Sequence, residues 1–416
     1  MARTLNKENL LNNPRFISAA KALYSDNLEA CVQRYASLCK NLDGQIRFFS
    51  SPGRAELVGN HTDHNNGFVI ATSIDMDVAA AATPTTDGKI TVNSVGYPSF
   101  TVDTSPAQPS SEQYGTSPAL VKGVVKGFLD RGYKVGGFIA NTHSSIFKGA
   151  GVSSSAAFEL LICEILNVLY NDGKVDFIEK ALISQFAENV YFGKPSGLMD
   201  QLTISRGGVS FMDFEDASLP KLESIKWPFS QTNIVIVNCG GDHCDLTDEY
   251  AAIRQEMGKV AAFFGKKTLR EVDAKTFLNA IPMLKTKLDG RAILRAWHYF
   301  EENIRAQNAK KAIELSDKSQ FLDIINASGD SSYKLLQNCY PMGDTEQNIP
   351  LALALSKSCA NVKACRVHGG GFAGTILAIV DKENCAAFEK YIASVFGKEN
   401  VFTVAIREFG AIEVEI

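Results

Sequence analysis

The feature that most constrains this chain is a run of small residues placed immediately before an apolar helix. Residues 149–157 read Gly-Ala-Gly-Val-Ser-Ser-Ser-Ala-Ala, and residues 156–169 have the length and apolar content of a buried helix. Small side chains let a ligand approach the backbone closely, and the first amides of a helix lack partners within it. The sequence therefore predicts a turn and helix start suited to binding a phosphate.

A serine-capped helix start packed against a sheet would explain part of the same pattern. One serine is enough for a cap, however, and in this run three glycine or alanine residues precede three serines. Phosphate binding is the favoured interpretation, with the hydroxyls as hydrogen-bond donors or Mg²⁺ ligands. The chain contains no Gly-x-x-x-x-Gly-Lys-[Ser/Thr] sequence, so the run is not a Walker A loop.

Strand-like and helix-like stretches mix along the whole chain, which predicts an α+β protein. A strand over residues 45–50 is expected to break at Ser51-Pro52-Gly53. A polar stretch over residues 213–228 suggests two domains, residues 1–215 and 216–416. The other expected helices are residues 14–42, 119–130, 176–191, 248–308 and 385–396. The other expected strands are residues 68–74, 89–95, 136–142, 207–212, 233–238, 364–367, 375–380 and 401–405.

Composition excludes several classes of function. The 416 residues carry 42 Lys+Arg against 46 Asp+Glu, a net charge of −4, whereas nucleic-acid binders usually have a basic excess. No apolar run reaches the roughly 18 residues of a membrane span, and residues 1–9 do not resemble a signal peptide. Nine cysteines without a Cys-x-x-Cys pair indicate reduced thiols. We expect a cytoplasmic protein with no nucleic-acid or membrane partner.

A second motif, over residues 51–67, crowds Arg, Asn, His and Asp side chains between glycines. Their varied donors and acceptors suit a hydroxyl-rich or charged ligand. A metal site built from His61, Asp63 and His64 is a less favoured alternative, because adjacent ligands in one short loop seldom complete a site. A solvated polar loop would explain the polarity but not the apolar residues beside it.

A third motif comprises Glu188 and residues 193–201, in which Asp200 follows an apolar pair. A partly buried carboxylate there is either functional or one half of a structural ion pair. Gly369, Gly371 and Gly374 formally match Gly-x-Gly-x-x-Gly, but a strand follows them where a dinucleotide fold requires a helix. They predict a glycine turn between two strands; whether it approaches a ligand is left open.

In this order the motifs resemble those of the GHMP small-molecule kinases and, within them, the galactokinase family. Residues 52–67 resemble the signature Gly-Arg-x-Asn-x-x-Gly-Glu-His-Thr-Asp-Tyr-Asn, residues 149–157 the ATP loop, and residues 369–374 the third family motif. Residues 187–188 and 195–201 keep the spacing around the family's catalytic aspartate. Arg295, His298 and Asn303 resemble a family helix.

The resemblance implies a two-domain GHMP kinase fold, with an N-terminal domain like ribosomal protein S5 domain 2, a C-terminal ferredoxin-like domain, and the active site between them. It implies phosphoryl transfer from ATP to the C1 hydroxyl of galactose, with Mg²⁺ as cofactor. A sugar and ATP are the expected small-molecule partners, and the expected state is a monomer or a weak homodimer.

Site residues follow from motif position. The resemblance implies that Asp200 is the base and Arg54 the charge-stabilising arginine beside it. The implied sugar-binding residues are Arg54, Asn60, His61, Asp63, Gly197, Asp200 and Tyr250. The implied nucleotide-binding residues are Gly149, Ala150, Gly151, Val152, Ser153, Ser154, Ser155 and Ala156. The implied Mg²⁺ ligands are Ser155 and Glu188, whose hard oxygens suit that ion.

The chain departs from the family pattern at five positions, none of which removes the base, the arginine or the phosphate loop. Asn60 replaces Glu, Glu56 replaces Asn, His64 replaces Tyr, Phe147 replaces Pro, and Asn189 replaces His. In the family the glutamate at position 60 contacts the C6 end of galactose. Because asparagine is uncharged, a sugar with a C6 carboxylate, such as galacturonate, is an alternative substrate. Galactose is the substrate we favour.

Two further alternatives are functions other than sugar phosphorylation. A non-catalytic sugar sensor is disfavoured by the complete serine run and by Asp200, and a mevalonate or homoserine kinase by the His-Thr-Asp of the sugar signature. The remaining histidines stand apart from the motifs and are expected to be structural or exposed; they are His143, His243, His298 and His368.

Overall fold

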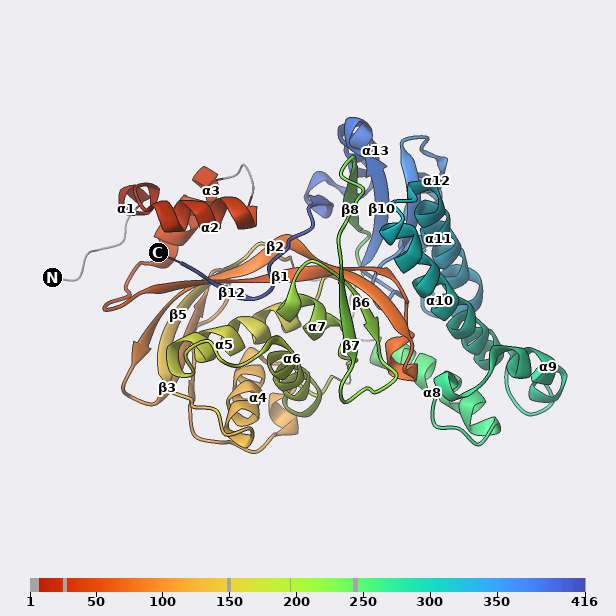
Figure 1. Cartoon of the computed structure of the whole chain (residues 1–416), viewed down its shortest axis with the longest axis horizontal. Helices are drawn as coiled ribbons and strands as arrows, with labels where there is room; N and C mark the ends of the chain where they lie inside the picture. The colour runs from red at the N-terminus through yellow and green to blue at the C-terminus, as the bar shows by residue number, and fades with distance from the viewer. Residues whose placement is uncertain (1–6, 25–27, 148–150, 195, 242–245, 416) are drawn as a thin grey trace.

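The structure is a computed structural model that describes residues 7–24, 28–147, 151–194, 196–241 and 246–415. Over these residues, helices mix with strands that form one eight-stranded and one four-stranded sheet (Figure 1). The predicted α+β class is confirmed. Among the described helices, none is both long and apolar enough to cross a membrane.

The larger sheet has the order β12-β1-β2-β5-β3-β4, and β6 and β7 extend it from β2. All its pairs are antiparallel except β3 with β5. Its strands are β1 (Arg47–Val58), β2 (Phe68–Thr85), β3 (Lys89–Ser94), β4 (Phe100–Asp103), β5 (Gly137–Ser144), β6 (Val209–Asp213), β7 (Lys221–Ile225) and β12 (Ile412–Val414).

The strand β1 does not end where the sequence predicts. It continues through Pro52 and Gly53 to Val58, with shifts of register against β2 at Pro52/Gly53 and at Glu56/Val58. At Pro52/Gly53 the register skips Asp75 and Met76 of β2, and this irregularity tolerates proline without ending the strand, so the predicted break is wrong. As a result Arg54 and Glu56 lie within a buried strand and not in a loop.

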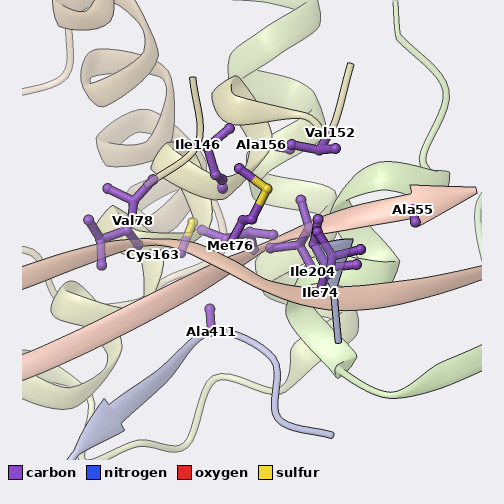
Figure 2. Close-up of a cluster of buried hydrophobic side chains, with 14 of the residues drawn as sticks. Ala55, Ile74, Met76, Val78, Ile146, Val152, Ala156, Cys163, Ile204 and Ala411 are labelled. Atoms are coloured by element: carbon purple, nitrogen blue, oxygen red, sulfur yellow. The ribbon is translucent and has the colours of Figure 1, made fainter. Parts of the chain in front are cut away.

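Both faces of the larger sheet are covered by helices (Figure 1). Alternate residues of β2 serve the two faces: Ala79 and Ala81 contact the N-terminal helices, and Ala80 and Ala82 the opposite core. Figure 2 shows part of that opposite core, where Ala156 of α5 (Ser154–Tyr170) lies near Ile74 and Met76 of β2. Small side chains let helices approach both faces closely.

The N-terminal helices are α1 (Lys7–Leu11), α2 (Pro14–Tyr24) and α3 (Leu28–Leu38), so the helix expected over residues 14–42 is two helices. On the opposite face, α4 begins after Thr116, whose hydroxyl accepts from the Ala119 amide, and α6 after Asp176, which accepts from two amides. The helices of that face are α4 (Ser117–Asp130), α5 (Ser154–Tyr170), α6 (Phe177–Phe186), its π-helical extension η3 (Ala187–Tyr191) and α7 (Met199–Arg206).

The smaller sheet is antiparallel with the order β11-β8-β10-β9. Its strands are β8 (Thr232–Asn238), β9 (Val362–Val367), β10 (Thr375–Asp381) and β11 (Val401–Val404). One face packs on α12 (Asn348–Ser358) and α13 (Cys385–Phe396), and the other on α10 (Gly290–Glu314) and α11 (Lys318–Ser331). Residues 369–374, here named the glycine turn, join β9 to β10, which confirms the predicted turn between strands.

The helical stretch expected over residues 248–308 consists of α8 (Thr247–Phe263), α9 (Ala274–Leu284) and most of α10. The short helical turns elsewhere are η1 (Asp63–Asn65), η2 (Ser111–Gln113), η4 (Leu269–Glu271), η5 (Ser332–Leu336), η6 (Lys382–Asn384) and η7 (Lys398–Asn400). Two strands of the larger sheet, β7 and β12, lie beyond residue 215, so this sheet includes residues from both sides of the expected domain boundary. The boundary at 215/216 stays a prediction.

Candidate active site

The described part of the run before α5 is a tight turn held against β1. Gly151 and Ser153 have φ of +64° and +62°. A Cβ on Gly151 would lie 2.5 Å from Thr375 Oγ1, so glycine is required there. The Arg54 amide donates to the Val152 carbonyl at 3.1 Å. These contacts hold the turn between β1 and β10.

The start of α5 is open to a ligand. Among the described residues no side chain caps it, and Ser153 donates its hydroxyl hydrogen bond to Asp200 instead. Ser154 is exposed, whereas Ala156 is buried in the core. An uncapped helix start attracts anions, and this geometry favours phosphate binding over a merely capped helix.

Asp200 lies in the first turn of α7 and forms a two-pronged ion pair with Arg54 of β1. Arg54 Nε lies 2.6 Å from Oδ1 and Nη2 lies 2.9 Å from Oδ2. The third guanidinium nitrogen donates to the Gly151 carbonyl. The Arg54 side chain is 7% exposed and that of Asp200 is 23% exposed, so the carboxylate reaches the surface of the site. The pair thus adjoins the phosphate-loop candidate.

The carboxylate of Asp200 is ionised. Burial by itself raises its pKa, but the charge of Arg54 and hydrogen bonds from Arg54 and Ser153 outweigh burial, so the pKa lies below its usual range. A carboxylate in this form can accept a proton from a hydroxyl group placed against it.

Two further acidic side chains, Glu159 of α5 and Glu188 of η3, each accept a hydrogen bond from a serine. Ser155 Oγ donates to Glu188 Oε1 at 2.7 Å, and in the reverse sense Ser184 donates to Glu159 Oε2 at 2.5 Å. This reciprocal Ser–Glu exchange ties α5 to α6 and η3. Burial, followed by the charge of Glu188, holds the pKa of Glu159 well above its usual range.

The predicted Mg²⁺ ligands fit that ion in the chemistry of their atoms. Glu188 is 1% exposed and accepts hydrogen bonds from Ser155, Lys194, Ser196 and Gln201, at 2.7 to 2.9 Å. One carboxylate and one hydroxyl oxygen suit Mg²⁺, which usually takes its other ligands from phosphates and water. In this structure the ammonium group of Lys194 pairs with Glu188 and balances its negative charge.

Within the described residues, no cluster of three or more His, Cys, Asp or Glu side chains could hold a metal ion. The alternative metal site at His61, Asp63 and His64 therefore does not form. Because burial lowers the pKa of His61 and of His64, both rings are neutral.

The predicted sugar-binding residues converge from three elements. Asp63 lies directly against Gly197, where any Cβ would overlap its carboxylate. His61 Nε2 lies 2.9 Å from the Gly370 carbonyl, and Tyr250 of α8 donates to the Gly371 carbonyl at 2.9 Å. The structure thus brings His61 and Tyr250 to the glycine turn and Asp63 to Gly197.

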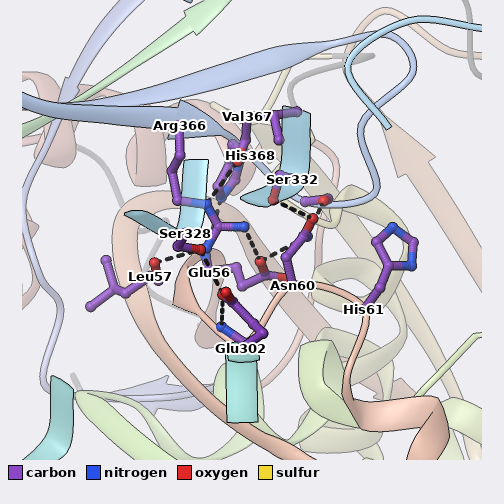
Figure 3. Close-up of polar contacts among 12 residues, drawn as sticks. Glu56, Leu57, Asn60, His61, Glu302, Ser328, Ser332, Arg366, Val367 and His368 are labelled. Atoms are coloured by element: carbon purple, nitrogen blue, oxygen red, sulfur yellow. Dashed lines mark hydrogen bonds and ion pairs between the residues drawn. The ribbon is translucent and has the colours of Figure 1, made fainter. Parts of the chain in front are cut away.

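Asn60 differs from the other predicted sugar-binding residues because both atoms of its side-chain amide, Nδ2 and Oδ1, form hydrogen bonds within the protein. Its Nδ2 donates to Glu56 Oε1 at 2.9 Å and to the Gly369 carbonyl at 2.7 Å. Its Oδ1 accepts from Asn338 at 2.9 Å and from Ser332 at 3.4 Å. Figure 3 shows Asn60 between Glu56 and Ser332. Asn60 is 1% exposed and has no free donor for a sugar.

The helix that resembles a family helix supports this region from outside. Arg295 donates to Glu256 at 2.9 Å and to the Leu336 carbonyl at 3.1 Å. His298 Nε2 lies 2.9 Å from the Asn60 carbonyl, and Asn303 accepts from the Phe68 amide at 2.9 Å. His298 and Asn303 thus hold the sugar signature and the residue after it, whereas Arg295 ties α10 to α8 and η5.

Of the histidines expected to be structural, His298 and His368 are buried and hydrogen-bonded, and His143 is bonded to Arg34. His243 lies outside the described residues, as do two predicted nucleotide-binding residues, Gly149 and Ala150.

Sequence reasoning missed several residues that shape the site. Lys194 reaches Glu188, Asn338 holds both Asn60 and the Gly370 carbonyl, and Arg366 pairs with Glu56 at 2.7 Å. A lysine next to the Glu188 motif was visible in the sequence. Asn338 lies in no motif, and only the fold brings it to the glycine turn.

Two protein-family models match the segments that contain the sugar signature and the run before α5. The galactokinase galactose-binding signature matches residues 36–84, and the GHMP kinases N terminal domain matches residues 119–208. Galactokinase of Actinobacillus pleuropneumoniae is 30% identical over 377 residues, 89% of this chain and 94% of the relative. Galactokinase of Clostridium tetani (strain Massachusetts / E88) is 29% identical over 363 residues, 86% of this chain and 89% of the relative.

Solved structures agree at the level of the fold. Lactococcus lactis galactokinase complexed with galactose superposes with a TM-score of 0.79 at 24% identity, covering 92% of this chain and 99% of that one. Methanococcus jannaschii mevalonate kinase gives a TM-score of 0.61 at 16% identity, covering 88% and 99%. These likenesses confirm the predicted GHMP kinase fold. With the galactose-binding signature in place and 30% identity across nearly all of a known galactokinase, the chain belongs to the galactokinase family of GHMP kinases.

Proposed function

We propose that this chain is a sugar 1-kinase that transfers the γ-phosphoryl group of MgATP to the C1 hydroxyl of galactose. The observation that carries the proposal is the Asp200–Arg54 pair, in which an ionised carboxylate adjoins the uncapped start of α5. The family relationship supports the same reaction, since the relatives compared above are galactokinases.

In the proposed reaction Asp200 is the general base. The C1 oxygen of the sugar forms a bond to the γ-phosphorus while the bond from that phosphorus to the β,γ-bridging oxygen breaks, and ADP leaves. The hydroxyl proton passes to Asp200, whose pKa below the usual range keeps it unprotonated at neutral pH.

Arg54 has two roles in this proposal. It holds both oxygens of Asp200, which orients the base, and it presents positive charge where negative charge develops on the transferred group. Phosphoryl transfer depends mainly on positioning and charge, so Arg54 matters as much as the base. The backbone of residues 151–156 would hold the phosphates.

Ser155 and Glu188 would hold Mg²⁺. When bound, the ion neutralises charge on the phosphates and orients them. Lys194, which donates to Glu188 at 2.9 Å, adds a positive charge beside the same site.

A kinase for galacturonate is the second candidate, and Asn60 is the observation that favours it. Position 60 carries no charge and donates no bond to a ligand, so a C6 carboxylate meets no repulsion from it. Galactose remains the first candidate because the sugar-signature residues His61 and Asp63, and Gly197 against Asp63, are all present.

The test is a coupled ADP-release assay with MgATP against galactose, N-acetylgalactosamine, galacturonate and glucose. Wild type and Asp200→Asn are compared, because the amide keeps the shape but cannot take a proton. We expect galactose turnover that falls about 10²- to 10⁴-fold in Asp200→Asn. Asp213→Asn is the matched control, since Asp213 also pairs with an arginine, Arg270, at 3.2 Å, but belongs to β6.

Each outcome has one meaning. Galactose turnover that survives in Asp200→Asn would contradict the assignment of the base. Preferred turnover of galacturonate would replace galactose as the substrate. Sugar binding without turnover of any sugar would indicate a sensor.

A further inference from the structure

Two of the five departures from the family pattern, Glu56 and Asn60, both lie in the sugar signature and contact each other. The signature has Asn at the position of Glu56 and Glu at the position of Asn60, so the acid and the amide have traded places. The structure brings these two side chains into direct contact, with Asn60 Nδ2 donating to Glu56 Oε1 at 2.9 Å. One carboxylate and one amide are therefore retained, in reversed positions.

The exchange places the acid on a buried arginine. Glu56 is 4% exposed and accepts from Arg366 Nη2 at 2.7 Å, and Arg366 is wholly buried (Figure 3). The other nitrogens of Arg366 donate to the carbonyls of Leu57 at 2.8 Å and Val367 at 3.0 Å. The carboxylate at position 56 is thus the counter-ion of Arg366, without which the guanidinium would be buried unpaired.

The exchange also changes what position 60 can do. The two N–H groups of Asn60 hold Glu56 and the Gly369 carbonyl, and its oxygen accepts from Asn338 and Ser332. An ionised glutamate has no donor and could hold neither of the first two. Asn60 therefore connects β1, η5 and the glycine turn in a way that the signature's acid cannot.

The glycine turn adjoins the catalytic pair, so its position matters to the site. A Cβ on Gly369 would lie 3.3 Å from the Gly151 carbonyl and 4.0 Å from Arg54 Nη2. The following carbonyls are held by residues of the proposed sugar site, Gly370 by His61 and Gly371 by Tyr250. A shift of Gly369 would displace these contacts together.

We propose that Glu56 and Asn60 are an exchanged carboxylate–amide pair, in which the acid neutralises Arg366 and Asn60 is a positioning residue that holds the glycine turn, not a sugar ligand. The claim about sugar affinity rests on the proposed function. The claim that the two side chains act as a pair does not, because unfolding measures it without any substrate.

The main experiment reverses the exchange without changing side-chain size, using Glu56→Gln, Asn60→Asp and the double variant of the full chain. Thermal midpoints are measured without ligand, and KM and kcat in the galactose assay. Asn60→Asp should lower the midpoint most, because it sets two buried carboxylates against each other. The double variant restores a single charge, so its midpoint should lie above that of Asn60→Asp.

The sugar readout separates positioning from simple destabilisation. Asn60→Asp removes the donor to the Gly369 carbonyl in the single and the double variant alike, so the KM for sugar should rise about fivefold in both, the effect of one lost hydrogen bond. The kcat should change less, because Asp200 and Arg54 are intact. Glu56→Asn with Asn60→Glu, which recreates the signature, serves if Asn60→Asp does not fold.

Asn326→Ala is the matched control. Asn326 also holds the backbone around β9, accepting from the Cys365 amide at 3.2 Å and donating to the Lys363 carbonyl at 3.1 Å, but at the end away from the glycine turn. It should lower the thermal midpoint and leave the KM for sugar unchanged.

Two results would overturn the proposal: midpoint losses that simply add in the double variant, or a double variant with the sugar KM of wild type. If wild type turns over no sugar, the proposed function fails, and the coupling of the midpoints still decides whether the residues act as a pair.

Discussion

Asp200 and Asp63 are carboxylates of one site whose pKa values move in opposite directions. Arg54 and Ser153 overcome burial and hold the pKa of Asp200 low, whereas burial raises the pKa of Asp63 to about 6. The difference is the partner: a paired guanidinium in one case and a neutral ring in the other. The proposed base therefore stays ionised at a pH where the proposed sugar ligand titrates.

From this we predict that the KM for sugar rises as the pH falls below about 6, while kcat changes little. The raised pKa means that Asp63 is protonated below that pH, and only the carboxylate accepts two hydrogen bonds from sugar hydroxyls. The measurement is the pH profile of KM and kcat for galactose.

Asp63→Asn provides the comparison for this prediction. Its KM should be high and independent of pH over the same range, because an amide does not titrate. A wild-type KM that stays constant from about pH 5 to 8 would show that Asp63 does not hold the sugar in its ionised form.

Among the elements, α10 is tied to the residue after β1 and to α11 through one buried acid. Glu302 is wholly buried, and its Oε1 accepts from the Gly59 amide at 2.9 Å and from Ser328 of α11 at 2.6 Å. Its Oε2 accepts from Arg305 at 2.6 Å. Burial would raise the pKa of Glu302, but the charges of Arg305 and other cations lower it to about 2.

We predict that Glu302→Gln removes stability on the order of 3 kcal/mol at pH 7, the equivalent of a pKa moved from 4.5 to about 2. The folded-state pKa is depressed, so this stability is complete above the unfolded value of 4.5 and is lost as the pH falls towards 2. Urea unfolding at several pH values measures it, and the variant should lack that part of the pH dependence.

Glu301→Gln is the control, because Glu301 pairs with the same Arg305 at 3.0 Å but is 43% exposed. An exposed pair contributes about 0–1 kcal/mol, so its loss should be small. Equal losses in the two variants would contradict the role given to burial.

At the scale of the whole molecule, the end of the chain completes the sheet that its first half begins. Ile412, Glu413 and Val414 of β12 pair with Ser50, Phe49 and Phe48 of β1. Val414 is wholly buried in the same cluster as Phe48 and the N-terminal helices. The two halves of the sequence therefore share one sheet.

We predict that deleting residues 412–416 destabilises the N-terminal helices together with the larger sheet. The loss of Val414 alone removes about 1.5–3 kcal/mol of apolar burial, and the β1 edge becomes unpaired. Urea unfolding should show the lower midpoint, and hydrogen exchange the faster exchange in β1. Glu413→Gln, which loses only the partly exposed pair with Arg47, should be close to wild type, and an unaffected truncation would contradict the prediction.

The sequence determined the parts of this protein that depend on local pattern. It predicted α5 from its apolar run, the turn between β9 and β10 from its glycines, and the motif order from which Asp200 and Arg54 were identified. These features are set by periodicity, by the conformational freedom of glycine and by residue type, which act over a few residues.

Only the tertiary structure decided what those motifs touch. Pro52 and Gly53 could form a bulge because β2 pairs on both sides of them, so β1 continues and buries Arg54 and Glu56. Asp200 meets Arg54 from 146 positions away, and Asn60 meets Asn338 from 278. Contacts between distant segments depend on how whole elements pack. The sequence named Asp200 and Asn60, and the fold decided that the first is a partly exposed carboxylate paired with Arg54 and the second a fully bonded residue beside the glycine turn.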